Sequence, residues 1–283
     1  MNKVIACIDT FNHTAETVCD FAAWSSQQMQ APLTLLHILE KADKPAKVNL
    51  SGSIGLGARE QLMDELSELD EKRSKILKEQ GRLILQEAKQ RAKDDGIQEA
   101  ETLQLHGDLI ENLLELEKDI RLLVMGREGS HENSPSHIGS HLESVIRTLH
   151  RPMLISVGDF KAPERFMIAY DASQTAKKAV DMVAGSPLLK GIPCTLLMVG
   201  ADTNTSHEQL KEAARTLEKE GFDVDLQLKA GDVDQVIDQT VSDLNIDLLV
   251  MGAYGHSRIR QFLVGSTTTK LLQHSRIPIL LLR

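Results

Sequence analysis

A glycine signature that occurs twice, in register, most constrains what this chain can fold into. The pattern G-x2-G-x9-G-S spans residues 126–140 and again residues 252–266. Each copy follows the dipeptide Val-Met, and each precedes a proline and an apolar run at the same distance. The two copies align without a gap, which indicates a duplicated module. The signature residues are Gly126, Gly129, Gly139 and Ser140 in the first copy and Gly252, Gly255, Gly265 and Ser266 in the second.

Each half alternates short apolar runs with helical patterns. The first runs, at 4–9 and 166–171, both end in an aspartate, Asp9 and Asp171. Runs that are apolar on both faces and alternate with helices are typical of a parallel sheet covered on both sides. The sequence therefore predicts an α/β fold of two tandem, doubly wound, five-stranded parallel-sheet domains of the Rossmann-like kind. We expect the domains at 1–158 and 165–283. Further strands are expected at 33–38, 102–106, 122–125 and 152–157, and at 195–199, 225–229, 248–251 and 278–282.

The first half also contains an insert at about 41–94, which the second half lacks. Residues 41–57 are rich in Lys, Gly and Ser and are predicted to form a loop. Residues 59–94 carry apolar residues at helical spacing, which predicts one long helix or two shorter ones, with Gly81 as a point of bending or interruption. Packing of this helix on its own sheet is the favoured interpretation. A cover over the first site, or a docking surface, is the alternative.

Composition excludes several classes of function. The net charge is -9, which argues against nucleic-acid binding because that needs a concentrated basic surface. Aromatic residues are only 3%, too few for stacking platforms. No apolar run has the length of a membrane span, and the first residues lack the pattern of a signal peptide. The scattered cysteines Cys7, Cys19 and Cys194 lack metal spacing and fit a reducing cytoplasm.

The glycine loops have the chemistry of a phosphate site. Glycines let main-chain N–H groups approach a ligand closely, and the signature serines fall where a helix is expected to begin. The first N–H groups of a helix lack partners within it and attract anions. Asp9 and Asp171 follow the first strands of their halves, so they should face the same crevice. Neither loop is a Walker A motif or a dinucleotide fingerprint.

Taken together, these motifs resemble the ATP-binding branch of the universal stress protein family, in a tandem form. The resemblance spans nearly the whole chain and rests on the aspartates, a Gly-Asp pair after each third strand, Val-Met-Gly, the glycine signature and the following proline. It implies a cytoplasmic stress-response protein that binds ATP, ADP or AMP, with Mg²⁺ as an optional companion of the phosphates. It also implies that the last strands of the halves, Met153–Val157 and Ile279–Leu282, pair with each other.

The resemblance assigns site residues in both halves. The adenine contacts would be Asp171 and Val199 in the second half and Asp9 and Ile38 in the first. The ribose and phosphate contacts would follow the strand-end methionines, Met251 and Met125. They comprise Gly252, Gly255, Gly265, Ser266 and Thr267 in the second half, and Gly126, Gly129, Gly139 and Ser140 in the first.

The two loops differ in their remaining residues. The second carries His256, Arg258 and Arg260, with apolar residues at 259 and 262–264 that can anchor it by burial. The first carries Glu128, Glu132 and Pro135, and most of that apolar anchor is absent. The second half is therefore the favoured nucleotide site. A metal site at His131, His137 and His141 is not expected, because no cysteine or carboxylate completes it.

The expected function is a nucleotide-dependent regulator and not a dedicated enzyme, because no general base or nucleophile lies beside the loops. Two alternatives stay open. One is slow ATP hydrolysis of the adenine nucleotide hydrolase type, although the usual Ser-Gly-Gly-x-Asp-Ser loop is missing. The other is an interaction scaffold without nucleotide. The protein partner and homodimerisation are also left open.

Overall fold

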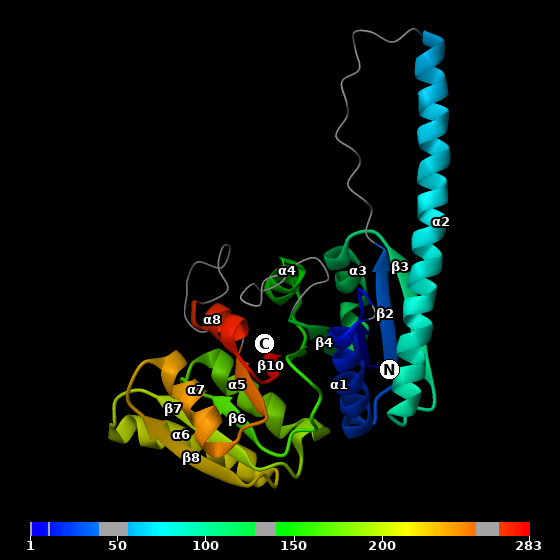
Figure 1. The fold of residues 1–283 in the computed structure, drawn as a ribbon. Helices are drawn as coiled ribbons and strands as arrows, with labels where there is room; N and C mark the ends of the chain where they lie inside the picture. The colour runs from blue at the N-terminus through cyan, green and yellow to red at the C-terminus, as the bar shows by residue number, and fades with distance from the viewer. Residues whose placement is uncertain (1, 11, 40–55, 128–139, 253–265) are drawn as a thin grey trace.

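The structure, a computed structural model, describes residues 2–10, 12–39, 56–127, 140–252 and 266–283. The first half alternates strands and helices along the chain (Figure 1). Its elements are β1 (Lys3–Cys7), α1 (His13–Met29), β2 (Leu33–Leu39), α2 (Leu56–Asp94), β3 (Ala100–His106), α3 (Leu109–Leu116), η1 (Glu117–Asp119), β4 (Ile120–Gly126), α4 (Ser140–Thr148) and β5 (Met153–Ser156).

The second half repeats the same order with shorter connections. Its elements are β6 (Phe166–Ala169), α5 (Gln174–Ala184), η2 (Pro187–Leu189), β7 (Cys194–Val199), α6 (Asn204–Lys219), β8 (Val224–Lys229), α7 (Val233–Leu244), β9 (Leu248–Gly252), α8 (Ser266–His274) and β10 (Ile279–Leu282). The helix α6 stands where the first half has the much longer α2. The predicted α/β alternation is thus confirmed in both halves.

All ten strands of the described residues belong to one sheet, in the order β3-β2-β1-β4-β5-β10-β9-β6-β7-β8. Each half contributes five parallel strands. The halves meet where β5 and β10 pair antiparallel, with Leu154 opposite Leu280. This pairing confirms the expected contact between the last strands. It also covers two sheet edges that would otherwise expose unpaired backbone groups.

Helices cover both faces of this sheet. The helices α1, α2, α5 and α6 pack on one face, where a continuous core of buried side chains runs through both halves. The helices α3, α4, α7 and α8 pack on the other face over a second core. Each core contains residues from the first and the second half, so the duplication shares its interior across the seam.

The Gly-Asp pair that follows each third strand has a structural explanation. Gly107 and Gly231 have φ values of +117° and +144°, a region that favours glycine. The next residue caps a helix: Asp108 accepts a hydrogen bond from the amide of Glu111, and Asp232 accepts one from Gln235. These pairs therefore turn the chain from strand to helix.

The segment between the halves, residues 157–165, is fixed at both ends. The hydroxyl of Thr17 in α1 donates to the carbonyl of Gly158 at 3.1 Å, and the rings of Phe21 and Phe160 meet edge to face at 4.8 Å. At the other end, the carboxylate of Asp247 accepts hydrogen bonds from the amides of Glu164 and Arg165. The join expected between 158 and 165 thus lies in an ordered connection.

The insert forms one long helix, α2, which was one of the two expected alternatives, and the interruption considered at Gly81 is not found. The helix continues through Gly81. Glycine is required there because neighbouring side chains leave no room for a Cβ. A Cβ at this position would lie 2.6 Å from Cδ2 of His37, and it would also overlap the amide of Gln104. His37 is buried and bonded to the carbonyl of Ile8, so the glycine lets the helix approach β2 and β3 closely.

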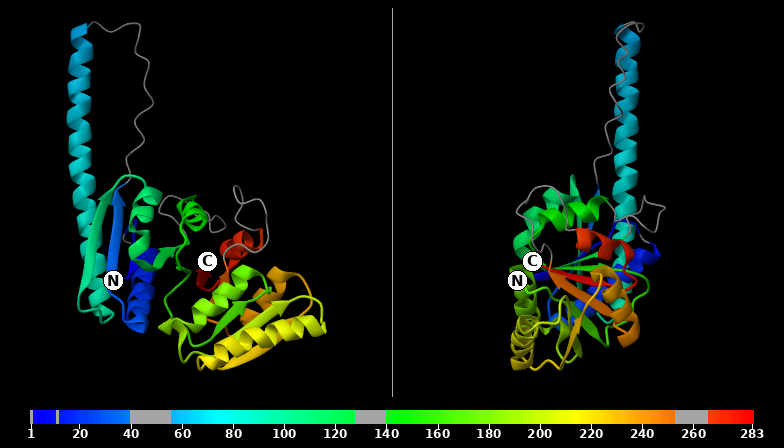
Figure 2. Two further views of the ribbon diagram at one scale, coloured as in Figure 1. Left: turned by 180° about the vertical axis from the view of Figure 1, so that it is seen from behind. Right: turned by 90° about the vertical axis from the view of Figure 1, so that its left-hand side faces the viewer.

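Only the last part of α2 packs on its own sheet. Ile84, Leu85, Ala88 and Ala92 are buried against β2, β3 and α1. Towards its N-terminus the helix extends well beyond the sheet and the other helices (Figures 1 and 2). The favoured expectation, a helix packed on its own sheet, is therefore correct only for the C-terminal turns of α2. No helix within the described ranges is long and apolar enough to cross a membrane.

Candidate functional site

The carboxyl ends of three neighbouring strands form the candidate site in the second half. The strand β6 lies between β7 and β9, and Ala169 in β6 is in register with Leu197 and Met251. Asp171 follows β6 by two residues, while Val199 and Gly252 end β7 and β9. Strand order reverses between β6 and β9, and the crevice outside such a reversal is where parallel sheets bind ligands. The fold thus brings Asp171, Val199, Met251 and Gly252 together.

Local backbone structure fixes the position of Asp171. Its Oδ1 accepts a hydrogen bond from the amide of Ser173 at 3.0 Å. Ala172, between them, has φ of +59°, which is uncommon for a residue with a side chain. Ser173 then caps α5 by accepting from the amide of Ala176. The tight turn leaves the exposed carboxylate of Asp171 beside the first turn of α5.

The tyrosine that precedes this aspartate remains a neutral phenol at physiological pH. Tyr170 is 4% exposed. Burial raises its pKa, and the carboxylates of Glu212 and Asp171 raise it further. The side chain of Tyr170 is part of the buried core beneath α5 and α6.

Gly252 has a packing role in addition to any role in binding. A Cβ at this position would lie 3.0 Å from the carbonyl carbon and oxygen of Thr175. The end of β9 therefore passes directly over the first turn of α5. Glycine is needed here for this close approach even without a ligand, so Gly252 by itself is weak evidence for a nucleotide site.

The first half repeats the arrangement. The strand β1 lies between β2 and β4, with Cys7 in register with Leu36 and Ala6 in register with Val124. Asp9 is exposed just beyond β1. Ile38 lies near the end of β2, and Met125 and Gly126 end β4. Four of the seven residues expected at this site, Asp9, Ile38, Met125 and Gly126, are therefore also at adjoining strand ends.

The middle of each glycine loop lies outside the described residues. This holds for Gly129, Gly139, Gly255 and Gly265, and for the basic and acidic residues that distinguish the loops. Ser140 and Ser266 are the first residues of α4 and α8, as expected from the signature, and Thr267 follows in α8. Their binding roles stay predictions.

The histidine cluster also falls mostly outside the described part of the chain. His131 and His137 lie there, and His141 is exposed on α4. Among the residues that the structure does describe, no group of three His, Cys, Asp or Glu side chains could hold a metal ion. The three cysteines are all described, and none forms a disulfide.

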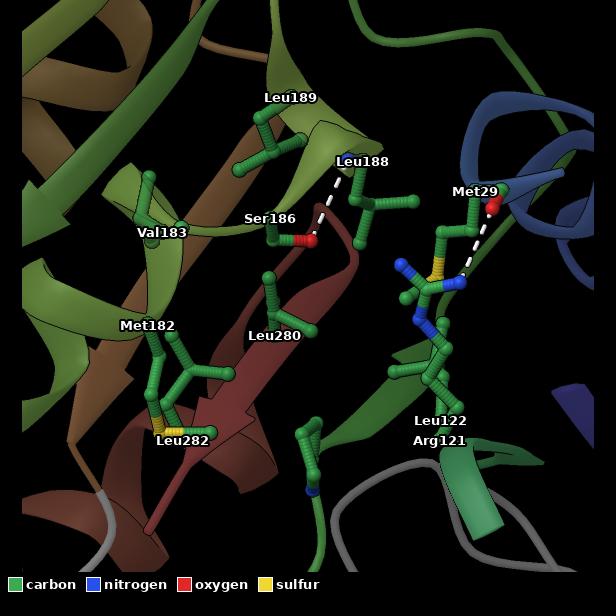
Figure 3. A pocket seen from close by; sticks show the side chains of 12 residues that line it. Met29, Arg121, Leu122, Met182, Val183, Ser186, Leu188, Leu189, Leu280 and Leu282 are labelled. Carbon is green, nitrogen blue, oxygen red and sulfur yellow. Dashed lines mark hydrogen bonds between the residues drawn. The ribbon is translucent and has the colours of Figure 1, made fainter. Parts of the chain in front are cut away.

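Two cavities in the described residues lie away from the predicted sites. One, of about 290 Å³, sits at the seam between the halves on the face of α1 and α5 (Figure 3). Its lining is mainly apolar, and Arg121 at its edge donates to the carbonyl of Met29 at 3.0 Å. The other, of about 540 Å³, lies between α7 and α8. Neither includes an expected contact of the nucleotide.

Sequence reasoning missed two residues at the candidate sites. Thr175 provides the backbone that Gly252 approaches, and nothing in the sequence marks it. Lys229 is in register with Val199 at the end of β8, where its ammonium group donates to the hydroxyl of Thr240 at 3.0 Å. A basic residue at the end of a strand that alternates apolar and polar residues was the available signal for Lys229.

Comparison with known proteins defines the class of this α/β chain. The model of the universal stress protein family matches residues 1–156 and 197–283. The chain belongs to this family. It is 32% identical over its full length to the whole of Universal stress protein Slr1230 of Synechocystis. Universal stress protein YxiE of Bacillus subtilis is 30% identical over 157 residues, covering 54% of this chain and 97% of that protein.

A solved structure shows the same architecture at full length. A universal stress protein from Archaeoglobus fulgidus superposes with a TM-score of 0.74, covering 100% of this chain and 98% of its own. The sequence identity is 17%, so this likeness concerns the fold alone. Together with the relative in Synechocystis, it shows that the doubled arrangement recurs in other members of the family.

Proposed function

We propose that this protein binds ATP or a related adenine nucleotide and acts as a nucleotide-dependent regulator of a stress response. One observation carries the proposal. Asp171, Val199 and Gly252 lie at neighbouring strand ends beside the strand-order reversal, and α8 begins at Ser266, the last residue of the glycine signature. The base would lie near Asp171 and Val199, and the phosphates at the N-terminus of α8. Mg²⁺ would accompany the phosphates.

The second half is the proposed principal site. Its loop combines basic residues, which suit phosphates, with apolar residues that can hold it in place. The loop of the first half has the glycines but carries acidic residues. We further propose that the chain is not a dedicated enzyme and that it works in the cytoplasm, where cysteines that form no disulfide would stay reduced. A protein that responds to nucleotide occupancy would be its partner.

The first experiment measures nucleotide directly. The purified chain is extracted with acid, and the extract is separated by chromatography to detect ATP, ADP or AMP. In parallel, the melting temperature is measured with and without ATP, because a ligand at ~100 times its Kd stabilises the folded state by about 2.7 kcal/mol. Absence of both co-purified nucleotide and an ATP-induced shift would contradict the proposal.

A matched pair of variants separates the two sites. Gly265→Val and Gly139→Val change the third glycine of each signature. A side chain at this position should exclude the phosphates, since glycine permits the closest approach of backbone to ligand. We expect Gly265→Val to lose nucleotide and Gly139→Val to keep it. The reverse result would assign the site to the first half.

The hydrolase alternative has its own readout. Multiple-turnover release of phosphate at ordinary enzymatic rates, abolished by Asp171→Ala, would show that the chain is an enzyme. Nucleotide that co-purifies intact and is not turned over supports the regulator.

A further inference from the structure

The cavity at the seam between the two halves is a space that the side chains of the protein leave unfilled. Its volume is about 290 Å³. A well-packed interior leaves few voids larger than a water molecule. An apolar cavity of roughly 150 Å³ is already large enough to bind benzene. The seam cavity therefore has room for a small organic molecule.

The floor and one wall of the seam cavity are apolar (Figure 3). Leu280 and Leu282 of β10, together with Leu122 of β4, line it from the sheet, and Leu188 and Leu189 of η2 close one side. All five leucines belong to the buried core that runs through both halves. Since water gains little from such a surface, the cavity favours an apolar occupant.

Two methionines lie on opposite sides of the cavity (Figure 3). Met29 is the last residue of α1 in the first half, and Met182 lies near the end of α5 in the second half. A methionine side chain is unbranched and has several rotatable bonds, so it adapts to the shape of what it contacts. These two walls can therefore adjust to a ligand.

One charged side chain, Arg121, lies at the edge of the cavity (Figure 3). Its Nη1 donates to the carbonyl of Met29 at 3.0 Å, and within the described ranges this is the hydrogen bond that the side chain makes. A guanidinium has five N–H groups, so others remain for a ligand. Ser186, the other polar side chain of the lining, accepts from the amide of Leu188 at 3.3 Å. The cavity thus combines an apolar interior with one cation at its edge.

The duplication shows what covers the equivalent position in the other half. The strands β4 and β9 share the sequence Ile-x-Leu-Leu-Val-Met-Gly, in which x is Arg121 in one half and Asp247 in the other. The carboxylate of Asp247 accepts hydrogen bonds from the amides of Glu164 and Arg165, and from Nζ of Lys161 at 2.8 Å. These three residues belong to the connection between the halves. Because that connection occurs once in the duplicated chain, it covers one of the two equivalent positions, and the cavity lies at the other.

We propose that the seam cavity binds an apolar monocarboxylate of the fatty-acid class, with the carboxylate on Arg121 and the hydrocarbon chain over Leu280 and Leu282. The planar guanidinium offers paired N–H groups that match the two oxygens of a carboxylate. A phosphate fits this cavity less well, because the rest of the lining is apolar and would leave its further charge unpaired. The ligand contacts both halves and so joins α1 to α5 across the seam. This site is independent of the proposed nucleotide site.

The position of the ligand is tested by NMR on the full-length chain, labelled with ¹³C at the methionine methyl groups and titrated with octanoate. Met29 and Met182 report on the cavity. Met198, buried in β7, and Met251, at the proposed nucleotide site, are the controls. We expect millimolar octanoate to shift the signals of Met29 and Met182 saturably and to leave the two control signals unchanged. Absence of a shift at Met29 and Met182, or equal shifts at all four methionines, would overturn the proposal.

Recognition of the carboxylate is tested with octanol, which has the same chain length and no charge. Octanoate should bind wild type about tenfold more tightly, since a hydrogen bond between ions is stronger than a neutral one. Arg121→Gln should abolish this preference while the affinity for octanol stays the same. The matched control is Arg151→Gln, because Arg151 also donates to a main-chain carbonyl, that of Glu117 at 2.8 Å, but lies away from the cavity. Full octanoate affinity in Arg121→Gln, or an equal loss in both variants, would overturn the role of Arg121.

A third variant fills the cavity itself. Leu280→Phe places a ring in the space proposed for the hydrocarbon chain and should weaken octanoate and octanol alike. Its melting temperature shows whether the fold is kept, and undiminished binding by the folded variant would place the ligand elsewhere and contradict the proposal. If Leu280→Phe does not fold, the methionine shifts and Arg121→Gln, which alters a residue at the edge of the cavity, still decide the question.

Discussion

At the base of α2, one arginine faces two carboxyl groups of different character. Arg91 donates two hydrogen bonds to Asp20 of α1, at 2.7 and 2.9 Å, and Asp20 is 7% exposed. Asp95, just beyond the helix, shares this surrounding. Burial raises its pKa to about 6, and the charge of Asp20 adds to the rise, while Arg91 opposes it. Folding therefore favours the protonated form of Asp95.

The raised pKa predicts that Asp95→Asn stabilises the protein above pH 6. A carboxyl group whose pKa is higher in the folded state binds a proton on folding, so its contribution to stability falls as pH rises from about 4 to about 6. With solvent screening of this partly exposed group, we expect a gain of about 1 kcal/mol at pH 8, or roughly 2–4 °C in melting temperature. The gain should vanish near pH 4.

The matched control for this prediction is Asp94→Asn, the exposed neighbour at the end of α2. Melting curves of both variants and wild type between pH 4 and pH 8 give the comparison. An equal gain from the two substitutions at pH 8 would attribute the effect to overall net charge and contradict the role of Asp95.

Gly81 shows what a single residue in a sequence does and does not reveal. Glycine within a helical pattern usually weakens the helix, and a bend or break was therefore expected. The structure shows a continuous helix, because the neighbour that requires glycine, His37, lies on β2, far away in sequence. The low helix propensity of glycine is real. The close contact with β2 that requires glycine at this position, however, leaves no signal in the neighbouring sequence.

At the scale of elements, arginines join the two halves at the seam. The guanidinium of Arg283, at the end of β10, donates to the carbonyls of Ile146, Arg147 and Leu149, at the C-terminus of α4. In the other direction, Arg127 after β4 donates to the carbonyl of Ser275, just after α8. The C-terminus of a helix carries partial negative charge, so each half supplies a cation to a helix of the other.

The contact predicts a measurable cost for Arg283→Ala. Loss of a cation and its hydrogen bonds at a helix C-terminus should destabilise the fold by about 1 kcal/mol, which corresponds to a melting temperature lower by roughly 2 °C. Arg276→Ala is the control, because Arg276 is exposed near the same seam and has the same charge. Equal melting temperatures for the two variants would show that Arg283 contributes only its charge.

Element types were predictable, while the surroundings of some elements were not. The strands of both halves lie within a few residues of their expected places. For α2, helical spacing predicted an amphipathic helix correctly. The same spacing did not predict that the apolar residues of α2 divide between two faces. Periodicity shows that a helix face is apolar, but it does not show what packs against that face.

At the scale of the whole molecule, duplication determined most of what the sequence could predict. Two copies of one strand pattern implied two equivalent parallel sheets, and the resemblance to the family implied that their last strands pair. The strand-end residues of both sites followed from the same pattern. The reciprocal arginines and the cores shared by both halves could not be predicted, because they depend on contacts between distant segments.

The shared cores predict that the chain unfolds in a single cooperative transition. Leu35 in β2 and Leu196 in β7 occupy equivalent positions in the two halves, and both are 0% exposed in the same continuous core. Replacing either with alanine should cost about 2–5 kcal/mol. If the halves unfold together, each variant lowers the temperature of one common transition, and the calorimetric and van't Hoff enthalpies stay equal. If they unfold separately, Leu35→Ala and Leu196→Ala each split the calorimetric trace, leaving one peak at the wild-type temperature. The antiparallel β5–β10 pair and the hydrogen-bonded segment 157–165 connect the halves. We therefore expect a single calorimetric transition for both variants.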